Sequence, residues 1–222
     1  MHPLYDEFIS YLNSEDKDQC VRFVLSHLEK QSIDVTTLYN QILTPAMYAD
    51  FCTEKEQEIC IWKEHVRTSI VRTIIECGYP YIIKERNTKY GSSSKGRAVV
   101  VCPPGELHEL GARIVADFFT LCGFNVTFVG ANTPQSDIIS AIKYVNPAYI
   151  AISITNYYNL VSTRRLIIKI RDMKVGTSFR MILGGQACQG NPDTCHEMGA
   201  DMILHTFEEI EKLVKGQDDV AF

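Results

Sequence analysis

Short apolar runs alternate with helical segments over the second half of the chain, and this alternation limits the fold more than any other feature. The apolar runs are residues 98–102, 125–129, 148–153, 180–183 and 201–204. Each run is followed by a segment with helical periodicity. Runs this short and this apolar are typical of parallel strands that are buried on both faces. Five such β-α units predict an α/β domain with one open parallel sheet and helices on both sides.

Residues 1–86 show a different pattern, in which apolar side chains recur at helical spacing. Leu4, Phe8 and Leu12 share one helix face. Three further segments with the same period follow before residue 86. Four helices joined by short connections predict a small four-helix bundle at the N-terminal end of the chain.

Glycine and proline residues mark the expected boundaries of these segments. Pro45 is expected to end or kink the third helix, and Gly78-Tyr79-Pro80 to interrupt the far end of the fourth. Residues 87–97 are polar and rich in Gly and Ser, so we expect them to be a linker. The chain then divides into a helical domain of residues 1–86 and an α/β domain of residues 98–222.

The charge and the apolar content disfavour several classes of function. The chain holds 22 Lys and Arg against 27 Asp and Glu, a net charge of -5, which argues against a surface for DNA or RNA. No apolar run approaches the roughly 18 residues that a membrane span needs. Residues 1–7 have neither the basic region nor the apolar core of a signal peptide. We therefore expect a cytoplasmic protein that binds neither DNA nor a membrane.

Eight cysteines are scattered along the chain without a Cys-x-x-Cys pair. This spacing disfavours a zinc ribbon and a thioredoxin-type site. Most of the cysteines lie within apolar patterns, so we expect them to stay reduced and to pack as small apolar residues. Cys188 with Cys195 and His196 is the one suggestive cluster of metal-ligand residue types, and we do not expect a metal there.

The loops that follow the first, third and fourth predicted strands are the places to look for a site, because open parallel sheets bind ligands at the carboxyl ends of their strands. These loops are residues 103–111, 153–156 and 184–187. They are neighbours if the strand order is flavodoxin-like. A Gly-x-Gly-x-x-Gly fingerprint is missing after the first strand, which disfavours a dinucleotide cofactor.

His108 lies in the first of these loops and has two interpretations. A lone histidine at the start of a helix is usually only solvated. Its place at the ligand-binding edge, two residues after Glu106, instead suits a functional imidazole whose other nitrogen is held by the carboxylate. Gly111, one turn further on, permits close approach of a ligand or close helix-sheet packing. Ser153 and Gly184-Gly185, each taken alone, also fit a strand-end hydroxyl and a turn.

Taken together, the three loops resemble those of the cobalamin-binding domains. That family carries Asp-x-His-x-x-Gly after the first strand, Ser-x-Leu or Ser-x-Thr after the third and Gly-Gly after the fourth. The counterparts here are Glu106-x-His108-x-x-Gly111, Ser153-x-Thr155 and Gly184-Gly185. The resemblance covers residues 98–216 and implies a Rossmann-like, flavodoxin-like fold. It also implies that His108 binds the cobalt of cobalamin from below, while the displaced nucleotide tail enters a cleft lined by Ser153 and the glycines.

The N-terminal half resembles the four-helix cap that covers the upper face of the corrin in some of these proteins. The resemblance is carried by Pro45-Ala46-Met47 and, later, by Glu64-His65. It is strongest to the light-dependent MerR-type repressors that use adenosylcobalamin, which also have Glu-x-His in the first loop and a Gly-Gly-Gln run. This implies that Glu64 and His65 lie near the upper ligand. It favours adenosylcobalamin as the cofactor, with methylcobalamin as the alternative.

Two departures from those repressors concern the cap. They have a Trp ten residues before the Glu-His pair, where this chain has Glu54, and Trp62 lies only two residues before Glu64. We expect Trp62 to be a packing residue, with a local shift that makes it the capping Trp as the alternative. Some repressors have a second cobalt-binding His after their Trp, where Lys55 stands here. These differences put a light response in doubt.

Two functions from different classes remain. The first is a sensory or regulatory cobalamin-binding protein, with a response to light as one form of that role, which signals by binding a partner protein and has no catalytic activity alone. The alternative is a corrinoid methyl carrier that serves a methyltransferase; such carriers usually have Asp where this chain has Glu106. A cofactor-free α/β protein is a third and less favoured interpretation. The sequence leaves open whether the protein forms a homo-oligomer.

Overall fold

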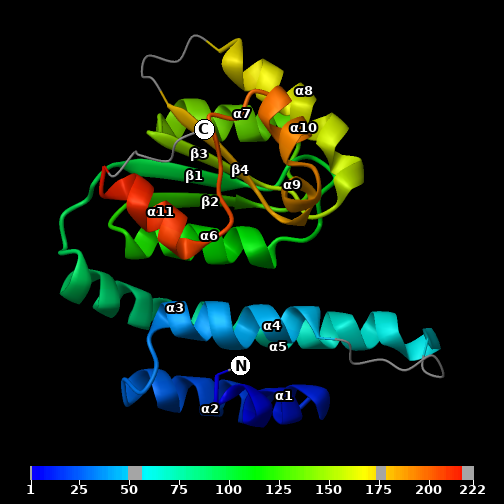
Figure 1. Cartoon of the computed structure of the whole chain (residues 1–222), viewed down its shortest axis with the longest axis vertical. Coiled ribbons are helices and arrows are strands. Elements are labelled where there is room, and N and C mark those ends of the chain that lie inside the picture. The colour runs from blue at the N-terminus through cyan, green and yellow to red at the C-terminus, as the bar shows by residue number, and fades with distance from the viewer. Residues whose placement is uncertain (1, 50–56, 174–178, 217–222) are drawn as a thin grey trace. The chain divides into compact units, whose positions relative to one another are not determined.

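The structure is a computed structural model that describes residues 2–49, 57–173 and 179–216 (Figure 1). The chain forms two compact units, Met1–Lys89 and Tyr90–Phe222. The division between the units falls inside the segment 87–97, which the sequence suggests as a linker.

The first unit is helical. Its elements are α1 (Tyr5–Asn13), α2 (Lys17–Glu29), α3 (Val35–Thr37), the π-helix η1 (Leu38–Leu43), α4 (Thr44–Tyr48) and α5 (Gln57–Lys89). The three short elements α3, η1 and α4 are consecutive, so they form the third of the four predicted helical segments. Pro45 lies in the first turn of α4, just after the change from π- to α-helix. Phe8 and Leu12 of α1 are fully buried, as their shared face predicts.

Helix α5 runs through the Gly78-Tyr79-Pro80 sequence without a break. The expected interruption there is therefore wrong. A proline inside a helix costs about 3 kcal/mol. Ile74 and Ile82, which lie on either side of Pro80, are fully buried, and their burial offsets that cost. Packing against the other helices thus overrides the tendency of Pro80 to break the helix.

The second unit contains the predicted parallel sheet. Its strands are β1 (Arg97–Val101), β2 (Asn125–Gly130), β3 (Tyr149–Ser153), β4 (Arg180–Gly184) and β5 (Met202–Ile203). All neighbouring strands are parallel, in the order β2-β1-β3-β4-β5. This is the flavodoxin-like order, so the predicted fold class is confirmed. The order places the carboxyl ends of β1, β3 and β4 side by side.

Helices cover both faces of this sheet. They are α6 (Leu110–Leu121), α7 (Gln135–Val145), α8 (Leu160–Arg171), α9 (Gln186–Gly190), α10 (Pro192–Glu197) and α11 (Phe207–Val214), with a 3-10 turn, η3 (Tyr157–Asn159), before α8. Figure 1 shows α6 and α11 on one face and α7, α8 and α10 on the other. Val99, Ile150 and Met181 of the strands pack with Ile142 of α7 and Leu166 of α8 in one buried core. No helix among the described residues is long and apolar enough to cross a membrane.

Cys188 and Cys195 form a disulfide between α9 and α10. The expectation that the cysteines stay reduced is therefore wrong for this pair. Both are completely buried, as the free thiols Cys102 and Cys122 also are, so burial alone does not indicate which cysteines pair. Across the described ranges, no group of three or more His, Cys, Asp or Glu side chains could hold a metal ion.

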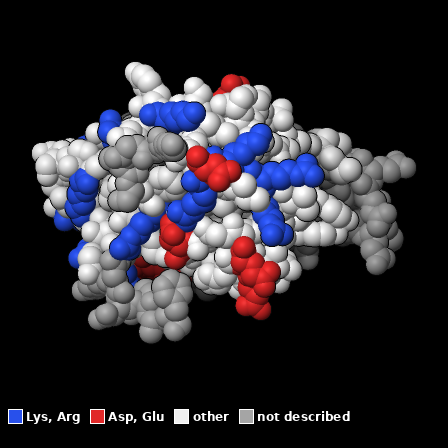
Figure 2. Space-filling view, turned by 90° about the horizontal axis from the view of Figure 1, so that it is seen from above, with Lys and Arg blue, Asp and Glu red and all other residues white. Residues whose placement is uncertain are grey.

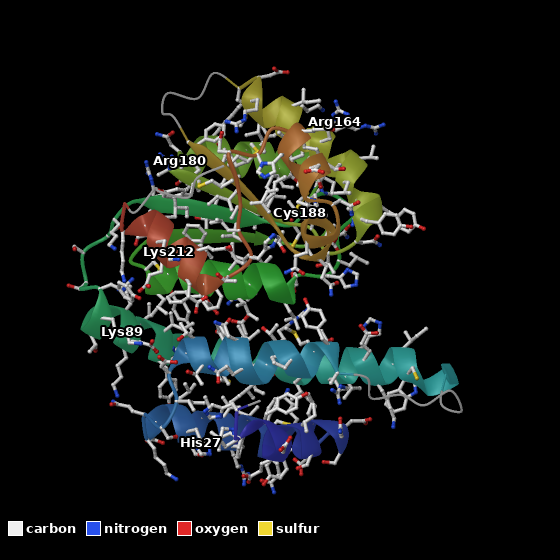
Figure 3. The ribbon with its side chains drawn as sticks, in the orientation of Figure 1. His27, Lys89, Arg164, Arg180, Cys188 and Lys212 are labelled. Atoms are coloured by element: carbon white, nitrogen blue, oxygen red, sulfur yellow. A yellow bond between two sulfur atoms is a disulfide. The ribbon has the colours of Figure 1, made fainter. Side chains whose placement is uncertain are left out.

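Charge is distributed unevenly over the second unit. Figure 2 shows Lys and Arg side chains gathered on the face that carries α8. Arg164, Arg165 and Lys169 all lie on the exposed side of that helix, and Arg164 is labelled in Figure 3. A protein with a net charge of -5 thus presents a basic face locally. The net charge alone does not describe the surface that a binding partner would meet.

Asp34 ties the start of α3 to the end of α5 within the helical unit. Its carboxylate accepts a hydrogen bond from the backbone N–H of Thr37 at 2.8 Å and one from the Lys89 ammonium at 3.1 Å. Glu85 accepts the N–H of Val35 at 2.9 Å and also binds Lys89 at 2.8 Å. Burial alone would raise the pKa of Asp34, but the hydrogen bonds from Thr37, Lys89 and Thr36 outweigh it and lower the pKa to about 2.

We predict that Asp34→Asn lowers the free energy of unfolding by about 1 kcal/mol at neutral pH, because a partly exposed cap and ion pair contributes roughly that much. The folded-state pKa lies below the ordinary value of 3.8. The stabilisation is therefore complete above about pH 4 and is lost as the pH falls toward 2. Urea unfolding followed by circular dichroism should show the gap between wild type and variant closing over that range. Asp6→Asn, which changes an exposed carboxylate in α1, is the control; a gap for Asp34→Asn that persists at low pH contradicts the assignment.

Candidate functional site

The predicted site residues of the second unit meet at the carboxyl ends of β1, β3 and β4. Ser153 at the end of β3 pairs in register with Gly184 at the end of β4. Ser162 at the start of α8 donates its hydroxyl to the carbonyl of Pro104 at 3.0 Å. That bond holds the loop after β1 beside the loop after β3. The flavodoxin-like order therefore brings the three candidate loops together.

Glu106 is the centre of this arrangement, and its side chain is completely buried. One carboxylate oxygen accepts the backbone N–H of His108 at 3.0 Å and the His108 Nδ1 at 2.6 Å. The other oxygen accepts the backbone N–H groups of Thr155 at 3.0 Å and Asn156 at 2.9 Å, and the Asn159 amide at 3.0 Å. Five donors therefore surround one buried charge, which makes the charge tolerable in the interior.

The electrostatics of the site keep Glu106 ionised. Burial by itself raises the pKa of Glu106, but the hydrogen bonds from Asn156, Asn159 and His108 outweigh burial and lower the pKa to about 2. An ionised carboxylate only accepts hydrogen bonds, so the proton of a neutral His108 ring lies on Nδ1. The lone pair then lies on Nε2, and 58% of the His108 side chain is exposed. His108 is thus an oriented imidazole with its free nitrogen available to a metal ion.

Ser153 and Gly111 form a second part of the site. Ser153 is only 8% exposed and lies at the end of β3. A Cβ added to Gly111 would lie 3.9 Å from the Ser153 hydroxyl. A serine hydroxyl can both donate and accept a hydrogen bond. Ser153 is therefore able to bond a ligand group that enters beside Gly111.

Gly184 and Gly185 line the third loop and permit close backbone contact. A Cβ at Gly184 would lie 2.6 Å from the carbonyl oxygen of Leu204. Gly185 has a φ of +94°, and a Cβ there would overlap the backbone of Ile154. A side chain at either position is excluded, so the glycine pair is a structural requirement of the sheet edge. A role in ligand binding remains compatible with this requirement, because the absence of side chains at both positions lets a ligand approach the backbone closely.

The remaining predicted residues, Glu64 and His65, lie next to each other on α5 in the helical unit, and both are exposed. His65 lines a shallow hollow with Glu15, Lys17, Val66, Ser69 and Ile70. We expected Trp62 to be a packing residue. It remains 48% exposed, so it does not pack in the core of the bundle. Glu54 and Lys55 lie outside the described residues.

The sequence patterns did not indicate that Asn156 and Asn159 are hydrogen-bond donors at the site. Asn159 donates its side-chain amide to Glu106, and Asn156 donates its backbone N–H. Asn156 also accepts the N–H of Tyr158 at 3.0 Å with its side chain, which caps the turn η3. An Asn directly after a strand and ahead of a helix is a recognisable cap. The bond from Asn159 to Glu106 has no such local signal.

Comparison with known proteins identifies the family that matches this fold and site. The B12 binding domain family matches residues 96–215, more than half of the chain. The trimethylamine corrinoid protein 1 of Methanosarcina acetivorans is 25% identical over 136 residues, which are 60% of this chain and 62% of that protein. The HTH-type transcriptional repressor CarA of Myxococcus xanthus is 22% identical over 153 residues, which are 68% of this chain and 48% of the repressor. The chain thus spans less than two thirds of the length of these relatives.

Among solved structures, the monomethylamine corrinoid protein of Methanosarcina barkeri resembles this chain with a TM-score of 0.78 at 15% identity. The match covers 96% of this chain and 98% of that protein. Similarity at this level of identity shows that the two proteins share a fold. It extends over the helical elements as well as over the sheet.

We predict that Glu106→Gln lowers the free energy of unfolding by about 2–4 kcal/mol. An amide cannot accept on its nitrogen side, so two or three of the five donors lose their acceptor inside the protein. Urea unfolding at neutral pH measures the loss. Glu197→Gln, at an exposed position on α10, is the matched control and should change stability by less than about 0.5 kcal/mol. A similarly small effect for Glu106→Gln would refute the role given to the buried carboxylate.

Proposed function

The chain belongs to the B12-binding domain family, and on that premise we propose that it is a corrinoid carrier protein. In this proposal His108 holds the cobalt of cobalamin from below, and the protein presents the cofactor to a methyltransferase partner. The observation that carries the proposal is the pair formed by Glu106 and His108. A buried anion that fixes Nδ1 and leaves Nε2 available is the arrangement that orients metal-binding histidines.

The residues present at the sheet edge suit a bound cobalamin. Imidazole is a good ligand for a borderline metal such as cobalt. The hydroxyl of Ser153, beside Gly111, offers a hydrogen bond to the displaced nucleotide tail. The bare backbone at Gly184 and Gly185 offers a wall without side chains. Thr155 is fixed by its N–H bond to Glu106, so it would line the same opening.

The protein's own part in methyl carriage is to bind and orient. When bound, cobalamin supplies a cobalt centre that can take up and release a methyl group. The bond from Nδ1 to the Glu106 carboxylate strengthens His108 as an electron donor, because the anion stabilises positive charge on the ring.

A second candidate is a regulatory cobalamin protein. Two features favour it: Glu106 stands where the carriers usually have Asp, and Glu64-His65 resembles the pair in the cap of the light-dependent repressors. The match to CarA, which extends over 68% of this chain, also supports it. The similarity to trimethylamine and dimethylamine corrinoid proteins, which recurs among the curated relatives, weighs in favour of the carrier.

We predict that His108→Ala removes the nitrogen ligand below the cobalt. The visible spectra of protein loaded with adenosylcobalamin or methylcobalamin should shift toward the base-off form. Affinity should fall by at least the roughly 10–100-fold that the loss of a ligand's hydrogen-bond partner typically causes. The fold should survive, because four other donors to Glu106 remain.

Two other histidines serve as controls for this experiment. His205→Ala, at an exposed position in the same unit, should change neither the spectrum nor the affinity. His65→Ala should keep the base-on spectrum and alter only the chemistry of the upper ligand. A protein-derived nitrogen ligand that persists in His108→Ala would show that the site is wrongly assigned.

A light experiment separates the carrier from the regulator. A methyl carrier acts by passing a methyl group to its partner. Its oligomeric state is therefore not expected to depend on which upper ligand the cobalt carries. We therefore predict that protein loaded with adenosylcobalamin elutes from gel filtration at the same volume before and after illumination. Illuminated protein without cofactor is the control. A light-dependent change in elution that needs the cofactor would overturn the carrier in favour of the regulator.

A further inference from the structure

The disulfide between Cys188 and Cys195 lies inside the core of the second unit. Both side chains are completely buried, and the two Cα atoms are 5.8 Å apart, within the usual range for a disulfide. Cys188 packs with Ile154 and Leu183 in the same core that holds the sheet to its helices. Figure 3 labels Cys188 on α9, beside the end of the sheet. The bond is therefore a covalent link at the edge that carries the site.

The half of this disulfide on α9 is connected directly to the cofactor site. Helix α9 starts immediately after Gly185. The backbone N–H of Ala187 donates to the carbonyl of Ile154 at 3.1 Å. The next residue, Thr155, donates its N–H to Glu106, which in turn holds His108. One short series of bonds thus runs from the residue before Cys188 to the imidazole of His108.

Helix α9 has little stability of its own. It contains five residues, far fewer than the roughly 12 that an isolated helix needs. Besides its packing, three bonds hold it: the disulfide, the hydrogen bond from the Ala187 N–H to Ile154, and a hydrogen bond from the Asn191 amide to the carbonyl of Ala187 at 3.1 Å. The backbone joins α9 to α10 through Asn191 alone, and the disulfide closes this connection into a small covalent loop. Cleavage of the disulfide would remove that cross-link. The contact between α9 and Ile154 would then rest only on the hydrogen bond from Ala187 and on packing.

We propose that Cys188 and Cys195 are a redox site coupled to the cofactor site. The oxidised form holds α9 against the loop after β3 and binds cobalamin more tightly than the reduced form does. The coupling rests on the proposed function, since it acts on cobalamin binding. Because coupling between two sites is reciprocal, bound cobalamin must oppose reduction of the disulfide by the same factor.

The chemistry requires a dithiol reductant. A thiolate of the reductant attacks one sulfur of the pair, the S–S bond breaks, and a mixed disulfide forms. The second thiol of the reductant then displaces the protein sulfur. Two electrons and two protons end on Cys188 and Cys195, and the reductant leaves as its own cyclic disulfide. Both sulfurs are inaccessible in the folded protein, so attack needs a local opening of α9 and α10.

The rate of reduction tests the coupling directly. Apo-protein and protein saturated with adenosylcobalamin are treated with dithiothreitol in the dark, samples are alkylated with iodoacetamide, and the peptide that contains both cysteines is followed by mass spectrometry. Attack needs a local opening that bound adenosylcobalamin opposes, so the cofactor should slow the reduction at least about fivefold, on the scale of typical equilibrium coupling between sites. Equal rates with and without the cofactor would overturn the proposal.

The affinity of the reduced form is the second measurement. Protein with the disulfide reduced, and the double variant Cys188→Ser/Cys195→Ser, should bind adenosylcobalamin about 5- to 20-fold more weakly than the oxidised protein. Cys77→Ser, which changes an exposed free thiol in the helical unit, is the matched control and should leave affinity unchanged. If the double variant does not fold, the affinity of reduced wild-type protein for adenosylcobalamin provides the comparison with the oxidised form.

The outcomes separate the redox site from the function on which it rests. Equal affinities of the oxidised and reduced forms would refute the coupling while leaving cobalamin binding intact. Failure of both forms to bind adenosylcobalamin would refute the proposed function itself. Slower reduction together with weaker binding by the reduced form is the result that supports the redox site.

Discussion

The buried carboxylate of Glu106 is the constraint on which the candidate site depends. It draws donors from the loop after β1 and from the loop after β3 with the turn η3 that continues it, two regions about 50 residues apart in sequence. Bringing them together around one charge fixes their mutual positions before any ligand arrives. The same carboxylate selects the His108 tautomer. Structural and chemical roles therefore fall on a single side chain, which explains why a charge is retained in the interior despite the cost of burying it.

The general fold follows from patterns that burial imposes on sequence. Strands covered on both faces need continuous apolar runs, so β1 and β3 can be recognised in the sequence with almost their observed bounds. Parallel strands place all their carboxyl ends at one edge, so the loops that hold Glu106, Ser153 and Gly184 could be grouped before their contacts were known. Local patterns failed where packing opposed them. Helix α5 continues through Pro80 because Ile74 and Ile82 are buried on either side.

The finer structure of the site depends on geometry that no local pattern carries. Asn159 is 53 residues from Glu106, and nothing near Asn159 in sequence indicates that its amide turns toward a carboxylate. Cys188 and Cys195 are separated by seven positions, but whether two such thiols meet is decided by the turn between two short helices. Glu64 and His65 were singled out by resemblance, and their place on an exposed stretch of α5 is compatible with binding a ligand without requiring it.

The two sides of the site are held by different forces, and they differ in what would weaken them. On the side of β1 and β3, one anion satisfies five donors, so the arrangement depends on charge. On the side of β4, Gly184 and Gly185 contribute only backbone, and no side chain of theirs can lock the loop. The short helix that follows is positioned by the N–H of Ala187 and by the disulfide at Cys188. Protonation or loss of a carboxylate therefore acts on one wall, and thiol chemistry acts on the other. A ligand that touches both walls would be sensitive to both.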